Sequence, residues 1–297
     1  MSINTPVANF SAVCSFTTVH NDTYPFISLD KTNLAGKSIF VAGASKGIGK
    51  ETALSLAKAG CSKIAIGARS DLSTLAEEMV TAATDAGKSA PQVLALKLDV
   101  TSEDSVQAAA DRITSEFGGV LDVLVCNAGN LEQWMPLADS KPAKWWQNYE
   151  TNVKGAYLLN HAFIPLLLKS EMKTSILTSS YAALRVMHGG SGYQSSKFAI
   201  CRLVEFIASE YEKQGLICFA LHPGTVRSEL ASKMPKELHA LFVDELALPA
   251  NTTVWLCRER RPWLSGRLVS VNWDMEELES KKDKIVEGNL FKFRMLV

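Results

Sequence analysis

The sequence predicts an α/β fold, a doubly wound parallel sheet with helices on both faces. Short apolar runs alternate with segments of helical pattern between residues 38 and 271. A glycine-rich turn follows the first apolar run directly and opens the first long helical segment. The chain has 297 residues, 47% of them hydrophobic, which is enough for one large core. Strands that alternate with helices in this way form parallel sheets covered on both faces.

Each expected strand is a short apolar run bounded by turn residues. The expected strands are Ser38–Ala42, Ile64–Ile66, Val93–Leu98, Val123–Cys126, Ser175–Thr178, Ile217–Leu221 and Leu268–Val271. The expected helices are 48–59, 72–86, 102–117, 145–170 and 193–214. Glycines follow the first three helices, as helix ends favour.

The two ends of the chain are interpreted separately. Residues 1–36 are rich in Ser, Thr and Asn with scattered aromatics, and we expect an arm that packs on the body. Residues 37–297 then form one domain, in which a helical lid near 227–248 covers the pocket. The run Arg258 to Arg261 is interpreted as a solvated helix end, and Glu277 and Lys281 are spaced for a helical ion pair.

Composition excludes several classes of function. Lys plus Arg equals Asp plus Glu at 31 each, so no basic field predicts nucleic acid as a partner. The first basic residue is Lys31, so we expect no secretory signal, which would begin with a charged segment. No apolar run has the length of a membrane span. Six cysteines show no CxxC pairing, which favours reduced thiols and a cytoplasmic protein. No cluster has metal-ligand spacing, so we expect no metal.

A dinucleotide site is predicted at the glycine turn. Its residues after the first strand are Gly43, Ala44, Ser45, Lys46, Gly47, Ile48 and Gly49. Glycines let the backbone approach a pyrophosphate, and the helix that follows offers free N–H groups. Arg69 ends the second strand, where an NAD site usually has a carboxylate. Lys46 and Arg69 therefore favour NADP(H), the alternative being two ordinary surface cations.

Two further segments follow strands and reach the same sheet edge. Asp99 and Val100 follow the third strand, and Asp99 is expected either to hold the adenine amino group or to help cap the next helix. Asn127, Ala128 and Gly129 follow the fourth strand. Ligands of such folds bind at this edge.

Tyr193 and Lys197 are the most informative pair of side chains. They lie four residues apart, which places both on one face of a helix, and Ser180 precedes the tyrosine by thirteen residues. A phenol beside an ammonium titrates well below its free value of about 10. Such a phenol can pass a proton to a carbonyl oxygen while a nicotinamide passes hydride to the carbon.

As an ordered set, these residues resemble the short-chain dehydrogenase/reductase (SDR) family over residues 36–275. The resemblance implies a Rossmann-like sheet of seven strands and a catalytic tetrad of Asn152, Ser180, Tyr193 and Lys197. In that family the tyrosine is the acid/base, the lysine lowers its pKa, and members form homodimers or homotetramers. Cofactor contacts are also expected at Pro223, Gly224, Val226 and Ser228. The ends of the chain resemble a fungal branch of the family with enzymes of secondary metabolism.

The substrate is expected to be a small molecule, apolar or aromatic, and no membrane partner is expected. Its expected contacts are Trp134, Met135, Arg185, Met187 and His188. Two functions compete at this point. One is an NADP(H)-dependent carbonyl reductase or alcohol dehydrogenase. The other is a protein of the same fold that catalyses a cyclisation or dehydration, or that senses the cofactor.

Overall fold

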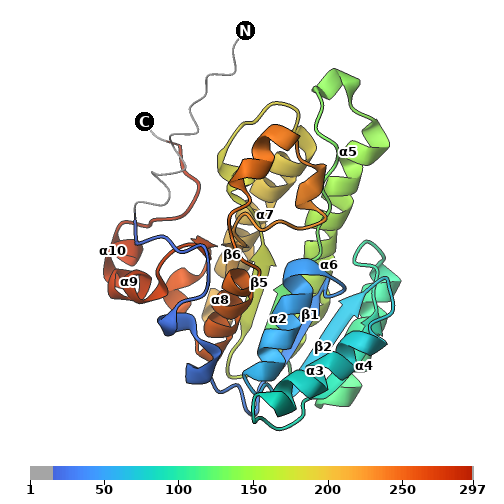
Figure 1. The fold of residues 1–297 in the computed structure, drawn as a ribbon, viewed down its shortest axis with the longest axis vertical. Helices are drawn as coiled ribbons and strands as arrows, with labels where there is room; N and C mark the ends of the chain where they lie inside the picture. Colours follow the sequence, from blue (N-terminus) through green and yellow to red (C-terminus); the bar gives the residue numbers. More distant parts are fainter. Residues whose placement is uncertain (1–15, 296–297) are drawn as a thin grey trace.

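The computed structural model describes residues 16–295 and contains one seven-stranded sheet (Figure 1). All six strand pairings are parallel, in the order β3-β2-β1-β4-β5-β6-β7. The strands are β1 Ser38–Ala42, β2 Lys63–Ala68, β3 Gln92–Lys97, β4 Val123–Cys126, β5 Thr174–Thr178, β6 Ile217–His222 and β7 Leu268–Ser270. The predicted seven-stranded Rossmann-like α/β fold is confirmed.

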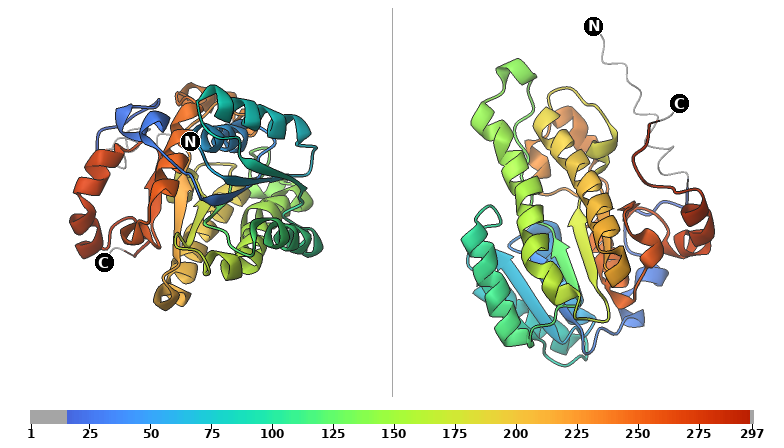
Figure 2. Two further views of the ribbon diagram at one scale, coloured as in Figure 1. Left: turned by 90° about the horizontal axis from the view of Figure 1, so that it is seen from below. Right: turned by 180° about the vertical axis from the view of Figure 1, so that it is seen from behind.

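Helices cover both faces of the sheet (Figures 1 and 2). One face packs against α2 Gly47–Lys58, α3 Ser73–Asp85 and α8 Ala247–Arg258. The other packs against α4 Glu103–Phe117, α6 Gly155–Leu167 and α7 Ser191–Glu210. The shorter helices are α5 Pro142–Asn148, α9 Met275–Ser280 and α10 Lys282–Glu287. Each face has its own buried core, so the sheet is apolar on both sides, except at the partly exposed edge strand β3.

The strand order reverses between β1 and β4. β1 pairs with β2 on one side and with β4 on the other. The chain segments that leave these neighbouring strands therefore diverge at the carboxyl edge of the sheet and leave a crevice there. The glycine turn after β1 and the segment after β4 both lie at this point.

The arm packs on the sheet face that carries α2 and α8. Ile27 and Leu34 are fully buried in its core. The Tyr24 hydroxyl accepts a hydrogen bond from the Met275 N–H at 2.6 Å, and its ring stacks on His20 with centroids 3.7 Å apart. Within residues 16–36 the arm contributes no strand to the sheet. The part of the expected arm before residue 16 lies outside the described residues.

The helix expected over 145–170 is not a single α-helix. The structure forms α5, a π-helix η5 Tyr149–Lys154, and then α6. The wider turn occurs at the residue expected to be catalytic, Asn152. Isolated π-turns within helices are frequent at functional sites.

The segment expected to form a helical lid contains two short 3-10 helices, Ala231–Lys233 and Lys236–Leu241. The interpretation of the arginine run as solvated needs correction at one residue. Arg261 is 3% exposed, and its guanidinium lies 3.5 Å from the centroid of the Trp255 ring. Arg261 also pairs with Glu279 at 3.1 Å. The sequence pattern gave no sign that this cation lies against an aromatic ring.

Other expectations agree with the structure. The Lys281 ammonium pairs with Glu277 at 3.0 Å across one helical turn. Cys61, Cys126 and Cys218 are buried free thiols, whose pKa values burial raises. Within residues 16–295, no helix is long and apolar enough to span a membrane.

Candidate active site

The glycine turn is held against the segment after β4 by close backbone packing. Gly43 has a φ of +96°, and a Cβ there would lie 2.5 Å from the backbone nitrogen of Ala128. A Cβ at Gly49 would lie 2.1 Å from the Gly43 oxygen, which is shorter than any real contact. The Asn127 amide donates to that same oxygen at 2.8 Å. Glycine is thus required where the turn meets β4.

A cavity of about 770 Å³ lies in front of this turn at the carboxyl edge of the sheet. The first turn of α2 faces it without a side-chain cap and without an acidic residue. Uncapped N–H groups and the positive end of a helix dipole bind phosphate well. The volume and this donor set fit a dinucleotide.

Many of the residues expected to bind cofactor line the cavity. They are Gly43, Ser45, Lys46, Gly47, Ile48, Arg69, Asp99, Val100, Asn127, Ala128, Gly129, Tyr193, Lys197, Pro223 and Ser228. Three others do not line it. Gly49 and Val226 are buried in packing, and Gly224 packs on Asp244, where a Cβ would lie 2.7 Å from the carboxylate. The sequence reasoning missed Asn130, after β4, and four lining residues on α5 and η5, which are Lys144, Gln147, Glu150 and Thr151.

At one end of the cavity, the charged groups of the expected adenosine site lie near one another. Arg69 is exposed at the end of β2, and none of the described carboxylates pairs with it. Asp99 accepts hydrogen bonds from Thr101 N–H and Oγ1 at 2.9 and 2.8 Å, and these lower the pKa of its carboxyl. The cap of α4 is Ser102, not Asp99. Asp99 therefore remains at the cavity wall.

One ion pair connects the lid segment to the glycine turn. Glu229 accepts from the Lys46 ammonium at 2.5 Å, and both side chains are mostly exposed. The far end of the lid is anchored by buried Asp244, which accepts from the Thr225 N–H and hydroxyl and from the Asn272 amide. Both hydrogen-bond donors of Thr225 are therefore bound to Asp244 in the lid segment.

Tyr193 and Lys197 line the inner end of the cavity, and Ser180 lies beside the tyrosine without lining the cavity itself. Ser180 follows β5, and its hydroxyl forms a hydrogen bond with the phenol of Tyr193. Lys197 lies one turn further along α7, with its Nζ 5.6 Å from the centroid of the tyrosine ring. The ammonium is buried and donates to the Thr178 carbonyl at 2.8 Å.

The pKa values of this pair differ from the sequence-based expectation. The pKa of the Tyr193 phenol is raised to about 12, chiefly by burial and to a lesser extent by the charge of Glu132, while the hydrogen bond from Ser180 lowers it. Burial lowers the pKa of the Lys197 ammonium to about 8. Removal from water disfavours both charged forms, and it is the largest cause of both shifts. The expected lowering of the tyrosine pKa is therefore wrong for the protein alone.

Asn152 ties three segments together at the base of the site. Its oxygen accepts from the Asn130 N–H at 2.8 Å, and its amide donates to the Asn130 carbonyl and to Ser196 Oγ at 3.0 and 2.9 Å. A Cβ at Gly129 would lie 3.5 Å from the Asn152 oxygen and 3.8 Å from the Lys197 Nζ. Both side chains therefore face one point beside the segment after β4.

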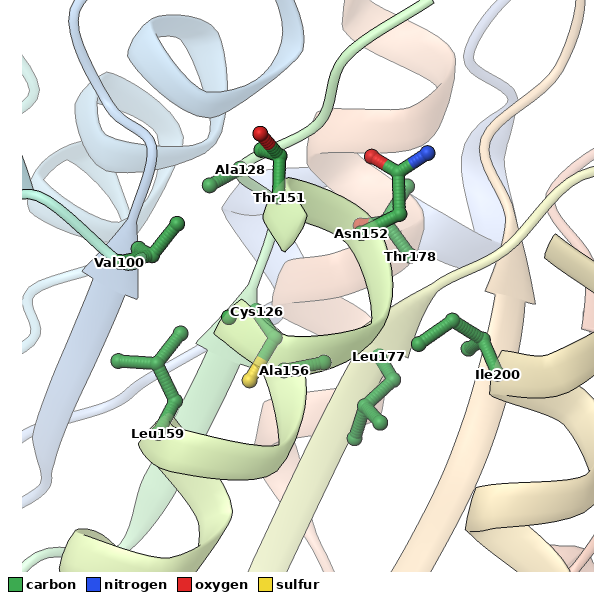
Figure 3. Close-up of a pocket in the computed structure, with 11 residues that line it drawn as sticks. Val100, Cys126, Ala128, Thr151, Asn152, Ala156, Leu159, Leu177, Thr178 and Ile200 are labelled. Atoms are coloured by element: carbon green, nitrogen blue, oxygen red, sulfur yellow. The ribbon is translucent and has the colours of Figure 1, made fainter. Parts of the chain in front are cut away.

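A second, small cavity of about 10 Å³ lies behind this point (Figure 3). Asn152 and Thr151 lie at one end, and Cys126, Leu159 and Leu177 line the rest. Its volume is near the lower limit of what one water molecule needs.

The five residues expected to contact substrate do not line the large cavity. The segments that carry them pack on each other, since Met135 N–H donates to the Gly189 carbonyl at 3.0 Å. A Cβ at Gly190 would lie 3.0 Å from the Trp134 ring. Gln194 on α7 exchanges two hydrogen bonds with the Met187 backbone. Arg185 is partly exposed and His188 is exposed.

Comparison with known proteins agrees with this geometry. Residues 37–239 match the family model described as short chain dehydrogenase. The chain is 45% identical over 292 residues to the short chain dehydrogenase mpl6 of Monascus purpureus, covering 98% of this chain and 99% of that protein. The predicted likeness to fungal members is confirmed.

Two solved structures share the fold. The first is a 3-ketoacyl-(acyl-carrier-protein) reductase from Brucella melitensis complexed with NADH. It is 23% identical with a TM-score of 0.68, covering 80% of this chain and 98% of that one. The second is an alcohol dehydrogenase from Thermococcus sibiricus complexed with 5-hydroxy-NADP. It is 28% identical with a TM-score of 0.64, covering 79% and 95% of the two chains.

Proposed function

The chain belongs to the short-chain dehydrogenase family, and on that premise we propose that it is an NADP(H)-dependent oxidoreductase. It would interconvert a carbonyl and a hydroxyl group of a small apolar or aromatic molecule. The observation that carries the proposal is that Tyr193 and Lys197 line the cavity that the uncapped end of α2 also faces, while the Ser180 hydroxyl is hydrogen-bonded to the Tyr193 phenol.

The residues that would hold the cofactor follow from the cavity wall. The glycine turn and the first turn of α2 would bind the pyrophosphate, and Asp99 the adenine amino group. Lys46 and Arg69 support a 2′-phosphate, because β2 ends in a cation where an NAD site has a carboxylate. Glu229 would have to release Lys46, and that ion pair is exposed and therefore weak. When bound, the nicotinamide supplies or accepts the hydride.

Tyr193 is proposed as the group that moves the proton. With a pKa of about 12, the phenol carries its proton at neutral pH and is ready to donate it to a carbonyl oxygen. Ser180 would orient that oxygen, because its hydroxyl already bonds the phenol. Lys197, fixed by the Thr178 carbonyl, would place a cation beside the phenolate that remains. This arrangement favours the reductive direction at neutral pH.

The fungal relatives support a place in secondary metabolism, and a dimer or tetramer is proposed from the long helices. Trp146, Tyr157, Phe198 and Phe206 are exposed on α5, α6 and α7 at 44–58%. Exposed apolar side chains of this size on neighbouring helices are typical of an interface.

The test compares the protein with its Tyr193→Phe variant. NADPH oxidation would be followed spectrophotometrically with a panel of ketones and quinones, and cofactor binding by calorimetry. The variant removes one oxygen, so turnover should fall by about 10²–10⁴-fold while NADPH binding is kept. Tyr211→Phe, at the far end of α7, is the matched control. A Tyr193→Phe protein with unchanged turnover would favour the non-redox alternative.

A further inference from the structure

One carboxylate near the site has no role in the mechanism above. Glu132 lies six residues after β4 and is 8% exposed. Its Oε1 accepts a hydrogen bond from the backbone N–H of Tyr193 at 3.1 Å. Its Oε2 is buried, and no described residue gives it a hydrogen bond. A buried carboxylate with one oxygen unpartnered is costly, so it needs an explanation beyond packing.

The position of Glu132 at α7 is tightly defined. A Cβ on Gly192 would lie 2.8 Å from Oε1 and 2.9 Å from the Asn148 amide nitrogen, so only glycine lets the carboxylate reach the helix. Gly190 is the N-cap residue of α7, and as a glycine it has no side chain with which to cap the helix. Glu132 thus satisfies one of the free N–H groups at the start of the helix from a segment far away in the sequence.

The N–H that it binds belongs to the proposed acid itself. A capping serine or aspartate at the helix start would satisfy the same N–H group without a buried charge beside the tyrosine. The charge of Glu132 disfavours the phenolate, whereas that of Lys197 favours it. Lys197 on α7, Glu132 on the segment after β4 and the Ser180 hydroxyl are the polar groups that act on the phenol.

We propose that Glu132 is a positioning residue for Tyr193. One carboxylate oxygen holds the backbone of the tyrosine at the start of α7, and the charge opposes that of Lys197 at the phenol. This inference rests on the proposed function, because it assigns Tyr193 as the proton donor. It gives the site a bias toward reduction, since a phenol near a carboxylate retains its proton to higher pH.

The experiment uses two substitutions that separate position from charge. Glu132→Gln keeps an oxygen that can accept the Tyr193 N–H and removes the charge. Glu132→Leu removes both. Glu210→Gln, at the exposed far end of α7, is the matched control for loss of charge on the same helix.

The expected results differ between the variants. In Glu132→Gln, the pH above which reductive turnover declines should be lower by roughly half a pH unit or more. NADPH affinity and maximal turnover should be nearly unchanged. In Glu132→Leu, maximal turnover should fall about tenfold, because the tyrosine backbone loses its anchor. Glu210→Gln should match the wild-type profile.

Two outcomes would overturn the proposal: a pH profile of Glu132→Gln that superimposes on the wild type, or wild-type turnover in Glu132→Leu. If Glu132→Leu does not fold, the pH profile of Glu132→Gln alone tests the proposal. Should no substrate be reduced, NMR of isotope-labelled Tyr193 would report the phenol titration directly. An unmoved titration in Glu132→Gln then refutes the role of Glu132, whereas a shifted titration with no turnover refutes only the proposed redox function.

Discussion

Lys197 should destabilise the folded protein in the absence of cofactor. Its ammonium is buried, and burial lowers its pKa from the ordinary 10.5 to about 8. That difference corresponds to roughly 3 kcal/mol of unfavourable free energy when the group is charged in both states. Lys197→Met keeps most of the volume and removes the charge. It also removes the hydrogen bond to the Thr178 carbonyl, which costs about 1 kcal/mol. The variant should therefore be more stable by roughly 2 kcal/mol at pH 7.

The sign of the pH dependence follows from proton linkage. Between about pH 8 and 10.5 the unfolded chain binds more protons at this lysine than the folded chain does. The destabilisation caused by Lys197 is therefore lost as the pH rises through that window, so the free energy of unfolding of the wild type increases. The stability advantage of Lys197→Met disappears over the same window. Below pH 8 the advantage is complete, because both states carry the charge.

The assay is urea unfolding of the two proteins at several pH values, without cofactor. Lys213→Met, at an exposed position after α7, is the matched control and should change stability little at any pH. A Lys197→Met protein less stable than the wild type by 2 kcal/mol or more at pH 7 would refute the reasoning, as would a gain that persists unchanged above pH 10.

Two other expectations concern the ends of the cavity. Arg69→Asp should weaken NADPH binding about ten- to a hundredfold and improve NADH binding, since a charge-assisted phosphate contact contributes roughly 1.5–3 kcal/mol. Equal calorimetric affinities of the wild type for both cofactors would contradict this. Asp244→Ala should leave the Thr225 N–H and the Asn272 amide without their acceptor. It should cost about 1–3 kcal/mol of stability and raise the KM for substrate. An Asp244→Ala protein with wild-type melting temperature and KM would show that this anchor does not hold the lid.

The sheet and the glycine turn could be predicted because their signals are local. Each strand is a short apolar run, and within the turn Gly43 has a positive φ while a Cβ at Gly49 would clash with the Gly43 oxygen. The π-helix around Asn152 was not predictable in this way. Its sequence has an ordinary helical pattern, and its geometry accompanies hydrogen bonds to Asn130 and Ser196 on two other segments.

The burial and pKa of charged side chains were the hardest properties to predict from the sequence, because distant residues determine their environment. Arg261 lies in a run of charges typical of solvent, yet Trp255 and Glu279 bury it. Lys197 was correctly expected beside Tyr193, but the sequence does not show how far both are removed from water. The predicted direction of the tyrosine pKa failed for that reason.

The buried polar groups at this site share one physical cost. Lys197 is kept charged where burial opposes it, and Glu132 keeps one oxygen without a partner. Folding stability alone would favour an apolar side chain in place of Lys197, and at the start of α7 an uncharged cap in place of Glu132. Their two charges act on the same phenol with opposite sign. The cost is therefore best explained by control of the Tyr193 proton, and for the lysine it should be visible as the gain of stability expected in Lys197→Met.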